Sequence, residues 1–285
     1  MLIIIPNAFG NAPTNMGIDA ALLQTIPSKT AIFRHYAWTE ASVTFGYTQK
    51  SMAVKDSFSQ SIKLNFCRRL TGGGIVDHRN DWTYSIILAN DLATAQKAPS
   101  KIYSELHQAI QTALDAHLIQ TKLAPCPKNC ADPLPQVPVN TSQCFVSASA
   151  DDVLRTDGRK IAGAAIKRAR TGLLLQGSID RGSLPHDFNF KDFQADFIDA
   201  LCSEWKIDPI EPEDLRISPA LIGISEGVIV SIEEGSRGSL QKKYPWNAQP
   251  GPQACLLYSP CSILAAELSE DWRLLAIIHS GSYTT

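Results

Sequence analysis

The sequence lacks the features that place a chain in a membrane, outside the cell or on a nucleic acid. No apolar run approaches the roughly 20 residues that a membrane-spanning helix needs. The first residues have no basic stretch, and their apolar run is too short for a signal peptide. The net charge is −2, which excludes a broad basic surface for nucleic acid or anionic lipid. Together these absences predict a cytoplasmic protein that binds neither nucleic acid nor membrane.

The sequence also lacks the patterns of the common cofactor sites. Its seven cysteines are scattered and odd in number, so we expect reduced thiols rather than a disulfide framework. Cys126 and Cys130 form a lone Cys-x3-Cys pair, which is too little for zinc, and no metal site is predicted. No dinucleotide-binding or Walker A pattern is present, and no Ser-His-Asp grouping can be assembled from spacing. What the sequence does contain is two glycine-rich segments.

The first segment combines adjacent arginines, adjacent glycines and a histidine: Arg68, Arg69, Gly72, Gly73, Gly74 and His78. Without Cβ atoms, the glycines let a ligand lie on the backbone, and their amides can point at an anion or a carbonyl oxygen. The guanidinium groups supply charge and paired donors for a carboxylate or phosphate. The segment therefore predicts a ligand-binding loop, with a plain glycine-rich turn as the alternative. The histidine is either a participant or a structural donor to the backbone.

The second segment is a strand-like run of small residues that contains one lysine. Lys160 precedes Gly163 and Ala164, which leave room for a ligand beside it, and Gly177 begins a Gly-Ser-Ile run shortly afterwards. A lysine there can hold the carboxylate or phosphate of an acyl adenylate, or stabilise the oxyanion of an attacked thioester. The alternative is an exposed lysine on a strand. We expect Lys160 and the three glycines of the first segment to line one pocket.

The apolar periodicity predicts a mixed α/β domain of the α+β class, with an antiparallel-rich sheet and helices packed on one side. Helices are expected over 15–25, over about 99–118 and near 188–201. Strands are expected at 1–5, 30–36, 42–47, 65–69, 82–89, 152–155, 160–168 and 173–179, whereas 221–232 is ambiguous. Five prolines within 124–143 predict a long irregular loop. Asp151 and Asp152 follow that loop and are expected to cap a turn rather than to act as an acid/base or metal pair.

These segments occur in the order found in the lipoate–protein ligase and octanoyltransferase family, which the chain resembles over residues 12–247. The resemblance implies a biotin/lipoate protein ligase-like catalytic domain over residues 1–250 and a short C-terminal extension, 251–285, that packs on the same domain. It also implies that Lys160 is the ligand-binding lysine. Two positions depart from the family pattern. Asp77 stands where relatives usually have an apolar or aromatic residue, and Gln176 stands where many have histidine, so details of the pocket are expected to differ.

Cys144 bears on which reaction the resemblance implies. One octanoyltransferase branch carries its acyl-accepting cysteine just before a phenylalanine, about 16 residues ahead of the lysine, and Cys144 has that place here. A thiol can take an acyl group from one thioester and pass it to an amine. An inert buried cysteine is the alternative. The first hypothesis is transfer of octanoyl or lipoyl from an acyl carrier protein to a lysine of a lipoyl-domain protein. Cys144 would be the nucleophile, Lys160 would stabilise the oxyanion, and no cofactor would be needed.

Two other hypotheses stay open. An ATP-dependent lipoate–protein ligase would take free lipoate or octanoate with ATP and Mg²⁺, and Arg68, Arg69 and Lys160 would hold the acyl-adenylate phosphate. The intact glycine triplet favours a ligase, because relatives that only transfer often break it. The roughly forty residues after position 247 are too few for the accessory domain of large ligases, which argues against it. The third hypothesis is a domain that binds a lipoyl or acyl carrier without chemistry, and the presence of Lys160 and Cys144 argues against it.

Overall fold

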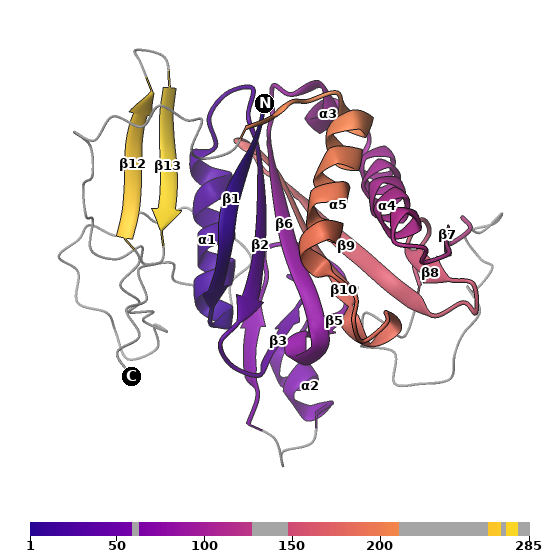
Figure 1. Ribbon diagram of the computed structural model, residues 1–285. Coiled ribbons are helices and arrows are strands. Elements are labelled where there is room, and N and C mark those ends of the chain that lie inside the picture. Colours follow the sequence, from indigo (N-terminus) through magenta and orange to yellow (C-terminus); the bar gives the residue numbers. More distant parts are fainter. Residues whose placement is uncertain (59–62, 127–147, 211–261, 269–271, 279–285) are drawn as a thin grey trace.

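The computed structural model describes residues 1–58, 63–126, 148–210, 262–268 and 272–278. Eight strands form the central sheet: β1 (Leu2–Gly10), β2 (Ala31–Trp38), β6 (Asp81–Ala89), β7 (Thr121–Leu123), β8 (Val153–Arg155), β9 (Lys160–Arg168), β10 (Gly172–Asp180) and β11 (Pro209–Ile210). Their order across the sheet is β11-β1-β2-β6-β10-β9-β8-β7 (Figure 1). β1 pairs in parallel with β2 and β11, and the other pairings are antiparallel. The predicted mixed α/β class with an antiparallel-rich sheet is therefore confirmed.

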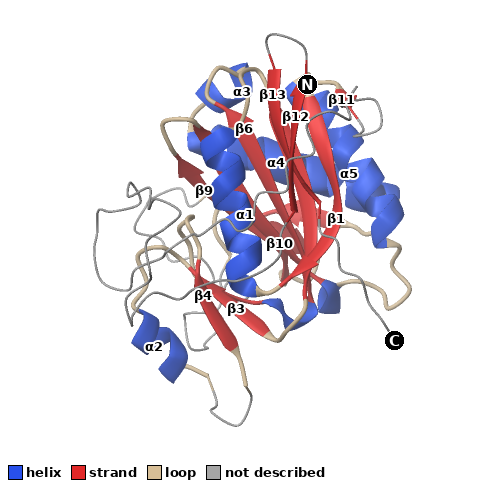
Figure 2. Ribbon diagram, turned by 90° about the vertical axis from the view of Figure 1, so that its left-hand side faces the viewer, coloured by secondary structure: helices blue, strands red, loops and turns tan. Residues whose placement is uncertain are grey.

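Two smaller sheets complete the described strands. The first consists of β3 (Ser42–Phe45), β4 (Asn65–Arg68) and β5 (Ile75–Asp77), with β3 in the middle. It lies below one end of the central sheet in Figure 2. The second pairs β12 (Ser262–Leu268) with β13 (Trp272–Ile278) in antiparallel fashion. The predicted boundary between residues 250 and 251, most of the predicted loop at 124–143 and the ambiguous run 221–232 lie outside the described residues.

Three long helices cover the central sheet: α1 (Ala12–Thr25), α4 (Pro99–Ala116) and α5 (Phe190–Trp205). They lie on both faces, whereas the sequence predicted one (Figure 2). Within β1, Leu2 and Ile4 join the core under α4 and α5, and Ile3 joins the cluster under α1. Successive residues of a strand point to opposite faces, so an apolar strand that alternates in this way needs a cover on each side.

The helix ends follow from local sequence. Asn11 caps α1 by accepting a hydrogen bond from the backbone amide of Thr14, and Pro13 stands in the first turn. Pro99 opens α4. Asn189 caps α5 by accepting from the amides of Lys191 and Asp192. The predicted long helices are therefore all present.

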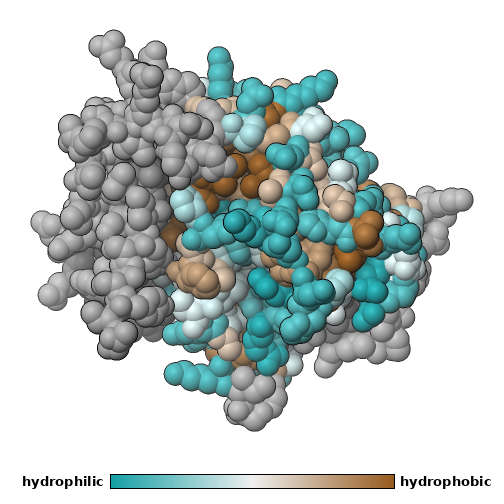
Figure 3. All heavy atoms as spheres, viewed as in Figure 1, coloured by the Kyte–Doolittle hydropathy of each residue, from teal (hydrophilic) through white to brown (hydrophobic). Residues whose placement is uncertain are grey.

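The remaining helical elements are short: α2 (Ser51–Asp56), α3 (Ala93–Gln96), and the 3₁₀ turns η1 (His78–Asn80) and η2 (Arg181–Ser183). The sequence did not predict them. Within the described ranges, no helix has both the length and the apolar character that crossing a bilayer would need. The face over α4 and α5 is mostly hydrophilic, with small apolar areas (Figure 3).

Candidate active site

A pocket opens where α1, the small sheet β4-β3-β5 and the central strands β6, β10 and β9 meet. It is lined by Met16, Tyr36, Thr44, Arg69, Gly73, Val76, His78, Thr83, Gly163, Ala164, Ala165, Gln176, Gly177 and Ser178. The two glycine-rich segments therefore meet at one pocket. Of the predicted binding residues, this lining includes Arg69, Gly73, His78, Gly163, Ala164 and Gly177.

The glycine triplet forms the turn between β4 and β5. Gly73 has φ = +85°, a left-handed conformation that residues with a Cβ rarely adopt. Among the described residues, a Cβ on Gly72 would meet no atom within 4 Å. A Cβ on Gly46 would lie 2.1 Å from the carbonyl oxygen of Gly73. The turn is therefore in backbone contact with the segment after β3.

Arg69 stabilises this turn, and Arg68 binds the segment after β3. Arg69 is buried, and its Nη2 donates to the carbonyl oxygens of Gly72 and Gly74, each at 2.7 Å. Arg68 Nη1 donates to the carbonyl oxygens of Tyr47 and Gln49, each at 2.6 Å, and its guanidinium stacks 4.9 Å from the ring centre of Phe45. The sequence predicted that both arginines bind an anion. In the structure these donors are directed at backbone carbonyls, so their anion-binding role stays a prediction.

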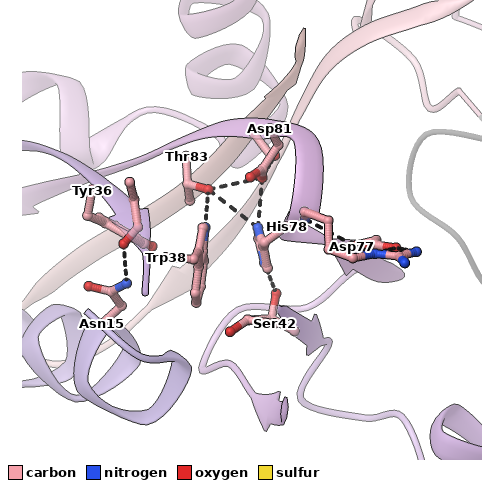
Figure 4. Close-up of polar contacts among 12 residues, drawn as sticks. Asn15, Tyr36, Trp38, Ser42, Asp77, His78, Asp81 and Thr83 are labelled. Carbon is pink, nitrogen blue, oxygen red and sulfur yellow. Dashed lines mark hydrogen bonds and ion pairs between the residues drawn. The ribbon is translucent and has the colours of Figure 1, made fainter. Parts of the chain in front are cut away.

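His78 lies at one end of the pocket in a buried hydrogen-bond network (Figure 4). Its Nδ1 lies 2.7 Å from Asp81 Oδ2, and its Nε2 lies 2.8 Å from Thr44 Oγ1. Its ring stacks on that of Trp38 with the ring centres 4.0 Å apart. Donation from Nδ1 to the carboxylate leaves Nε2 of a neutral ring to accept from the threonine hydroxyl. The arrangement joins a hydroxyl, an imidazole and a carboxylate, a grouping that spacing along the sequence did not reveal.

Asp81 connects this network to the floor of the pocket. Its Oδ2 also accepts hydrogen bonds from Thr83 Oγ1, at 3.0 Å, and from the hydroxyl of Ser178. Trp38 Nε1 donates to Thr83 Oγ1 at 2.8 Å. Asp81 Oδ1 is buried and has no hydrogen-bond partner within the described part of the chain. Thr44, Asp81 and Ser178 are polar residues of this site that the sequence analysis missed.

Lys160 lies beside the pocket, at the start of β9. Its side chain is 5% exposed, and its Nζ is 2.8 Å from Asp152 Oδ2, whose side chain is fully buried. A Cβ on Gly163 would lie 2.6 Å from Lys160 Nζ, so the lysine reaches this position because residue 163 is a glycine. Gly163 itself lines the pocket. The lysine ammonium thus lies next to a lining residue, although Lys160 itself is not among the residues that line the pocket. Asp152 is its counterion and also accepts from the turn amide of Ser149.

The two positions that depart from the family pattern have different surroundings. Asp77 caps η1 and forms an ion pair with Arg79, 2.6 Å away. Gln176 lines the pocket and bridges two parts of the fold. Its Oε1 accepts from Thr71 Oγ1, next to the glycine triplet, and its Nε2 donates to Asp19 Oδ2 on α1, each at 2.8 Å. Gln176 therefore ties the glycine turn to the helix below it.

Cys144, the predicted nucleophile, lies outside the described residues. The described free cysteines are Cys67, Cys126 and Cys202, of which Cys126 is exposed. Burial raises the pKa of the Cys202 thiol to about 11, which keeps it protonated near neutral pH. A search of the described residues finds no group of three or more His, Cys, Asp or Glu side chains that could hold a metal ion.

This fold defines a class of protein. The bi-partite lipoate protein ligase of a Thermoplasma acidophilum lipoylation system aligns with a TM-score of 0.52 at 15% identity, over 73% of this chain and 85% of its own. A lipoate-protein ligase A bound with ATP aligns with a TM-score of 0.52 at 17% identity, over 74% of this chain and 90% of its own. At such identities the likeness shows the fold alone, which is that of the lipoate protein ligase catalytic domains.

The sequence comparison is more specific. Residues 11–193 match the family model described as the lipoyl protein ligase A/B catalytic domain. This match spans more than half of the chain, and the protein belongs to that family. The resemblance found from the two glycine-rich segments is thereby confirmed.

The relatives that match in sequence include several named octanoyltransferase LipM. The enzyme of Bacillus cereus is 30% identical over 171 residues, which are 58% of this chain and 60% of the relative. Those of Bacillus subtilis and Clostridioides difficile are 28% and 27% identical over 180 and 192 residues, respectively. These two matches span 60% and 65% of this chain, and 62% and 66% of the relatives. The match to the Bacillus cereus enzyme thus covers less than two thirds of that relative's length.

Proposed function

We propose that this protein transfers an octanoyl or lipoyl group from an acyl thioester to a lysine of a lipoyl-domain protein, through a thioester on Cys144. The observation that carries the proposal is the placement of the Lys160 ammonium next to Gly163, a lining residue of the pocket that both glycine-rich segments reach. The relatives named octanoyltransferase LipM support the same reaction. Met16, Val76 and Ala165 give the pocket apolar walls that suit an acyl chain.

The reaction divides into two acyl transfers. In the first, the Cys144 thiolate attacks the carbonyl carbon of the acyl thioester, the bond from that carbon to the carrier sulfur breaks, and the carrier thiolate leaves and takes up a proton. In the second, the neutral ε-amine of the acceptor lysine attacks the Cys144 thioester. An amide forms, the carbon–sulfur bond to Cys144 breaks, and the nitrogen loses one proton, which the departing Cys144 thiolate takes up. Each addition creates an oxyanion, and a lysine ammonium with backbone amides is suited to stabilise it.

A ligase that activates free lipoate or octanoate with ATP is the second candidate. The glycine triplet favours it, because an adenylate could lie against the backbone there. The contacts of Arg68 and Arg69 favour the transferase, because their donors already hold the carbonyl oxygens of the turn and its neighbours. A phosphate would have to compete with those bonds. A carrier thioester needs neither ATP nor Mg²⁺.

Intact-mass spectrometry separates the two reactions. Incubation with octanoyl-carrier protein and no ATP should add one octanoyl mass to the protein, and hydroxylamine should remove it. Cys144→Ser should abolish the adduct, because a serine hydroxyl is a far poorer nucleophile than a thiolate. The matched control is Cys126→Ser, which removes an exposed thiol and should keep the adduct. Full acceptor modification by Cys144→Ser with ATP and free lipoate would instead identify a ligase.

A further inference from the structure

Lys160 is held by side chains from two other elements. Asp152, just before β8, places Oδ2 at 2.8 Å from Lys160 Nζ. Its other oxygen, Oδ1, accepts a hydrogen bond of 2.5 Å from the hydroxyl of Tyr103 on α4. The same hydroxyl accepts from the backbone amide of Ala164 at 3.3 Å. A connected path of polar contacts therefore runs from helix α4 through the carboxylate to the lysine.

A buried ion pair of this kind contributes little net stability to a fold. Two charges removed from water lose hydration that their mutual attraction only partly restores, and apolar residues of similar volume are often as stable or more so. Here both charged side chains are almost completely buried, at 5% and 0% exposure. The glycine at 163 makes room for both charged groups, because a Cβ there would lie 2.6 Å from Lys160 Nζ and 3.0 Å from Asp152 Oδ1. Three positions thus serve the placement of one ammonium group.

The groups around the carboxylate reinforce its role as the partner of Lys160. His107, one turn after Tyr103 on α4, is fully buried, and its Nδ1 is 3.0 Å from the carbonyl oxygen of Tyr103. Burial lowers the pKa of His107 to about 4, so the ring is neutral near pH 7 and does not compete as a cation. Tyr84, on β6, keeps its hydroxyl neutral because burial and the Asp152 charge raise its pKa. Lys160 is therefore the cation that balances Asp152.

We propose that Asp152 and Tyr103 are positioning residues that fix the Lys160 ammonium over Gly163, where it can reach the carbonyl oxygen of an acyl group in the pocket. Tyr103 orients the carboxylate, and the carboxylate orients the ammonium. The inference rests on the proposed acyl transfer for its consequence in turnover. The placement of the lysine can be measured without it.

The first test is Tyr103→Phe, which removes one hydroxyl and little volume. Tyr84→Phe is the matched control, because the Tyr84 hydroxyl is buried without a hydrogen-bond partner among the described residues. Lysine acetylation by acetic anhydride, followed by peptide mass spectrometry, reports how well Lys160 is held. Labelling of Lys160 should rise about tenfold in Tyr103→Phe and stay at the wild-type level in the control. Loss of one hydrogen bond to a charged group corresponds to about a tenfold change in an equilibrium or rate.

Kinetics of acyl transfer provide the second measurement. In Tyr103→Phe, kcat should fall about tenfold with KM within twofold of wild type, because the lysine acts on the oxyanion rather than on the bound ground state. Asp152→Asn keeps an oxygen for the Tyr103 hydroxyl but removes the charge, and its kcat should fall about 100-fold, again with KM within twofold. Far-ultraviolet circular dichroism checks that each variant is folded. Where Asp152→Asn does not fold, Tyr103→Phe carries the test.

The outcomes are distinguishable. Wild-type labelling in Tyr103→Phe would overturn the claim that Tyr103 holds Lys160. Increased labelling with unchanged kcat would overturn the link between that placement and turnover. A wild-type protein that transfers no acyl group would refute the proposed function, and the labelling would then decide by itself whether Asp152 and Tyr103 hold the lysine.

Discussion

The two faces of the central sheet are built from the same strands and differ sharply in chemistry. On the face under α4 and α5, β6 presents Trp82 and Tyr84 to a core of aliphatic and aromatic side chains. On the opposite face, the neighbouring residues Thr83 and Ser85 take part in buried hydrogen bonds, to Asp81 and Asp19 respectively. The alternation of side chains along a strand allows both. At these positions of β6, one face supplies apolar burial, and the other supplies a fixed arrangement of polar groups.

Burial alone does not distinguish residues that stabilise the fold from residues that form the site. Asp19 and Arg34 are as deeply buried as any core residue. Yet they lie beneath the pocket, and Asp19 accepts from Gln176, which lines it. We therefore expect substitutions of the aliphatic and aromatic core side chains under α4 and α5 to lower stability and leave the chemistry of the folded molecule intact. Substitutions on the polar face should affect both.

The largest stability effect should follow Phe197→Ala on the apolar face. Phe197 is fully buried on α5 and its ring contacts those of Phe33, Tyr84 and Phe193. Removing a buried aromatic ring costs about 3–5 kcal/mol of unfolding free energy. Urea unfolding would measure this loss, and acyl transfer per folded molecule should be unchanged below the transition. If the fully folded variant transferred acyl groups more slowly than wild type, Phe197 would affect the site as well as stability, and the difference between the two faces would not hold.

A somewhat smaller loss is expected for Arg34→Met on the polar face. Arg34 Nη1 lies 2.8 Å from Asp19 Oδ1, and Nη2 donates to Asn15 Oδ1 at 2.7 Å. Breaking a buried pair leaves an uncompensated charge, at a cost of about 3 kcal/mol. Transfer should also decline, because Gln176 is anchored on Asp19. Arg159→Met, which breaks an exposed pair, should leave the urea midpoint where it is.

An acid-induced loss of about 2 kcal/mol of unfolding free energy is expected from His107, a buried titratable group on α4. Burial lowers its pKa from the ordinary 6.5 to about 4. The unfolded chain therefore binds this proton first, and stability falls as the pH drops from 6.5 towards 4. pH 5 lies about 1.5 units below the pKa of the unfolded chain, so the unfolding free energy has fallen by about 2 kcal/mol at that pH.

The check is a comparison of urea unfolding at pH 7 and pH 5 in wild type and His107→Gln. The variant should lose about 2 kcal/mol less than wild type between the two pH values. His35 has a similarly lowered pKa of about 4, again mainly from burial, and remains in both proteins. An identical pH dependence in the two proteins would show that His107 is not buried as a neutral ring.

The smallest stability change should follow Thr44→Val at the His78 end of the pocket. The substitution keeps the shape and removes the hydroxyl next to His78 Nε2, for about 1 kcal/mol. Acyl transfer should nevertheless fall, because the imidazole loses the partner that orients it towards the pocket. Ser42→Ala is the matched control on the same strand, since the Ser42 hydroxyl donates to the carbonyl of Glu40. Equal transfer rates in the two variants would contradict a role for His78 in the site.

The sequence predicted best what depends on local periodicity. The fourfold spacing of Ile102, Leu106, Ile110 and Leu114 marks the face of α4 that is fully buried in the structure. The long strands of the central sheet also stand close to their predicted positions. The side of the sheet that each helix covers was not predictable in the same way. It depends on which neighbours fill both faces of a strand, and that is a property of the assembled fold.

The sequence predicted site residues only where a residue type has one common structural role. Small residues in two segments pointed to a common pocket, and Gly73 and Gly163 line one. Arginine donors serve a phosphate and a backbone carbonyl equally well, so the contacts of Arg69 could not be read from its presence. Two further contacts of the site join distant positions: Tyr103 and Asp152 are 49 residues apart, and Thr44 and His78 are 34 apart. No spacing rule connects them.

The backbone contact between Gly46 and Gly73 has a mechanical consequence. A turn that touches its neighbour without side chains between them cannot swing outward by itself, because Arg68 also ties β4 to the carbonyls of Tyr47 and Gln49. The small sheet and the glycine turn should therefore move together as one rigid body. Its attachments to the central sheet include the hydrogen bonds from Thr71 to Gln176 and from His78 to Asp81. Admitting a bulky ligand would strain these two bonds first.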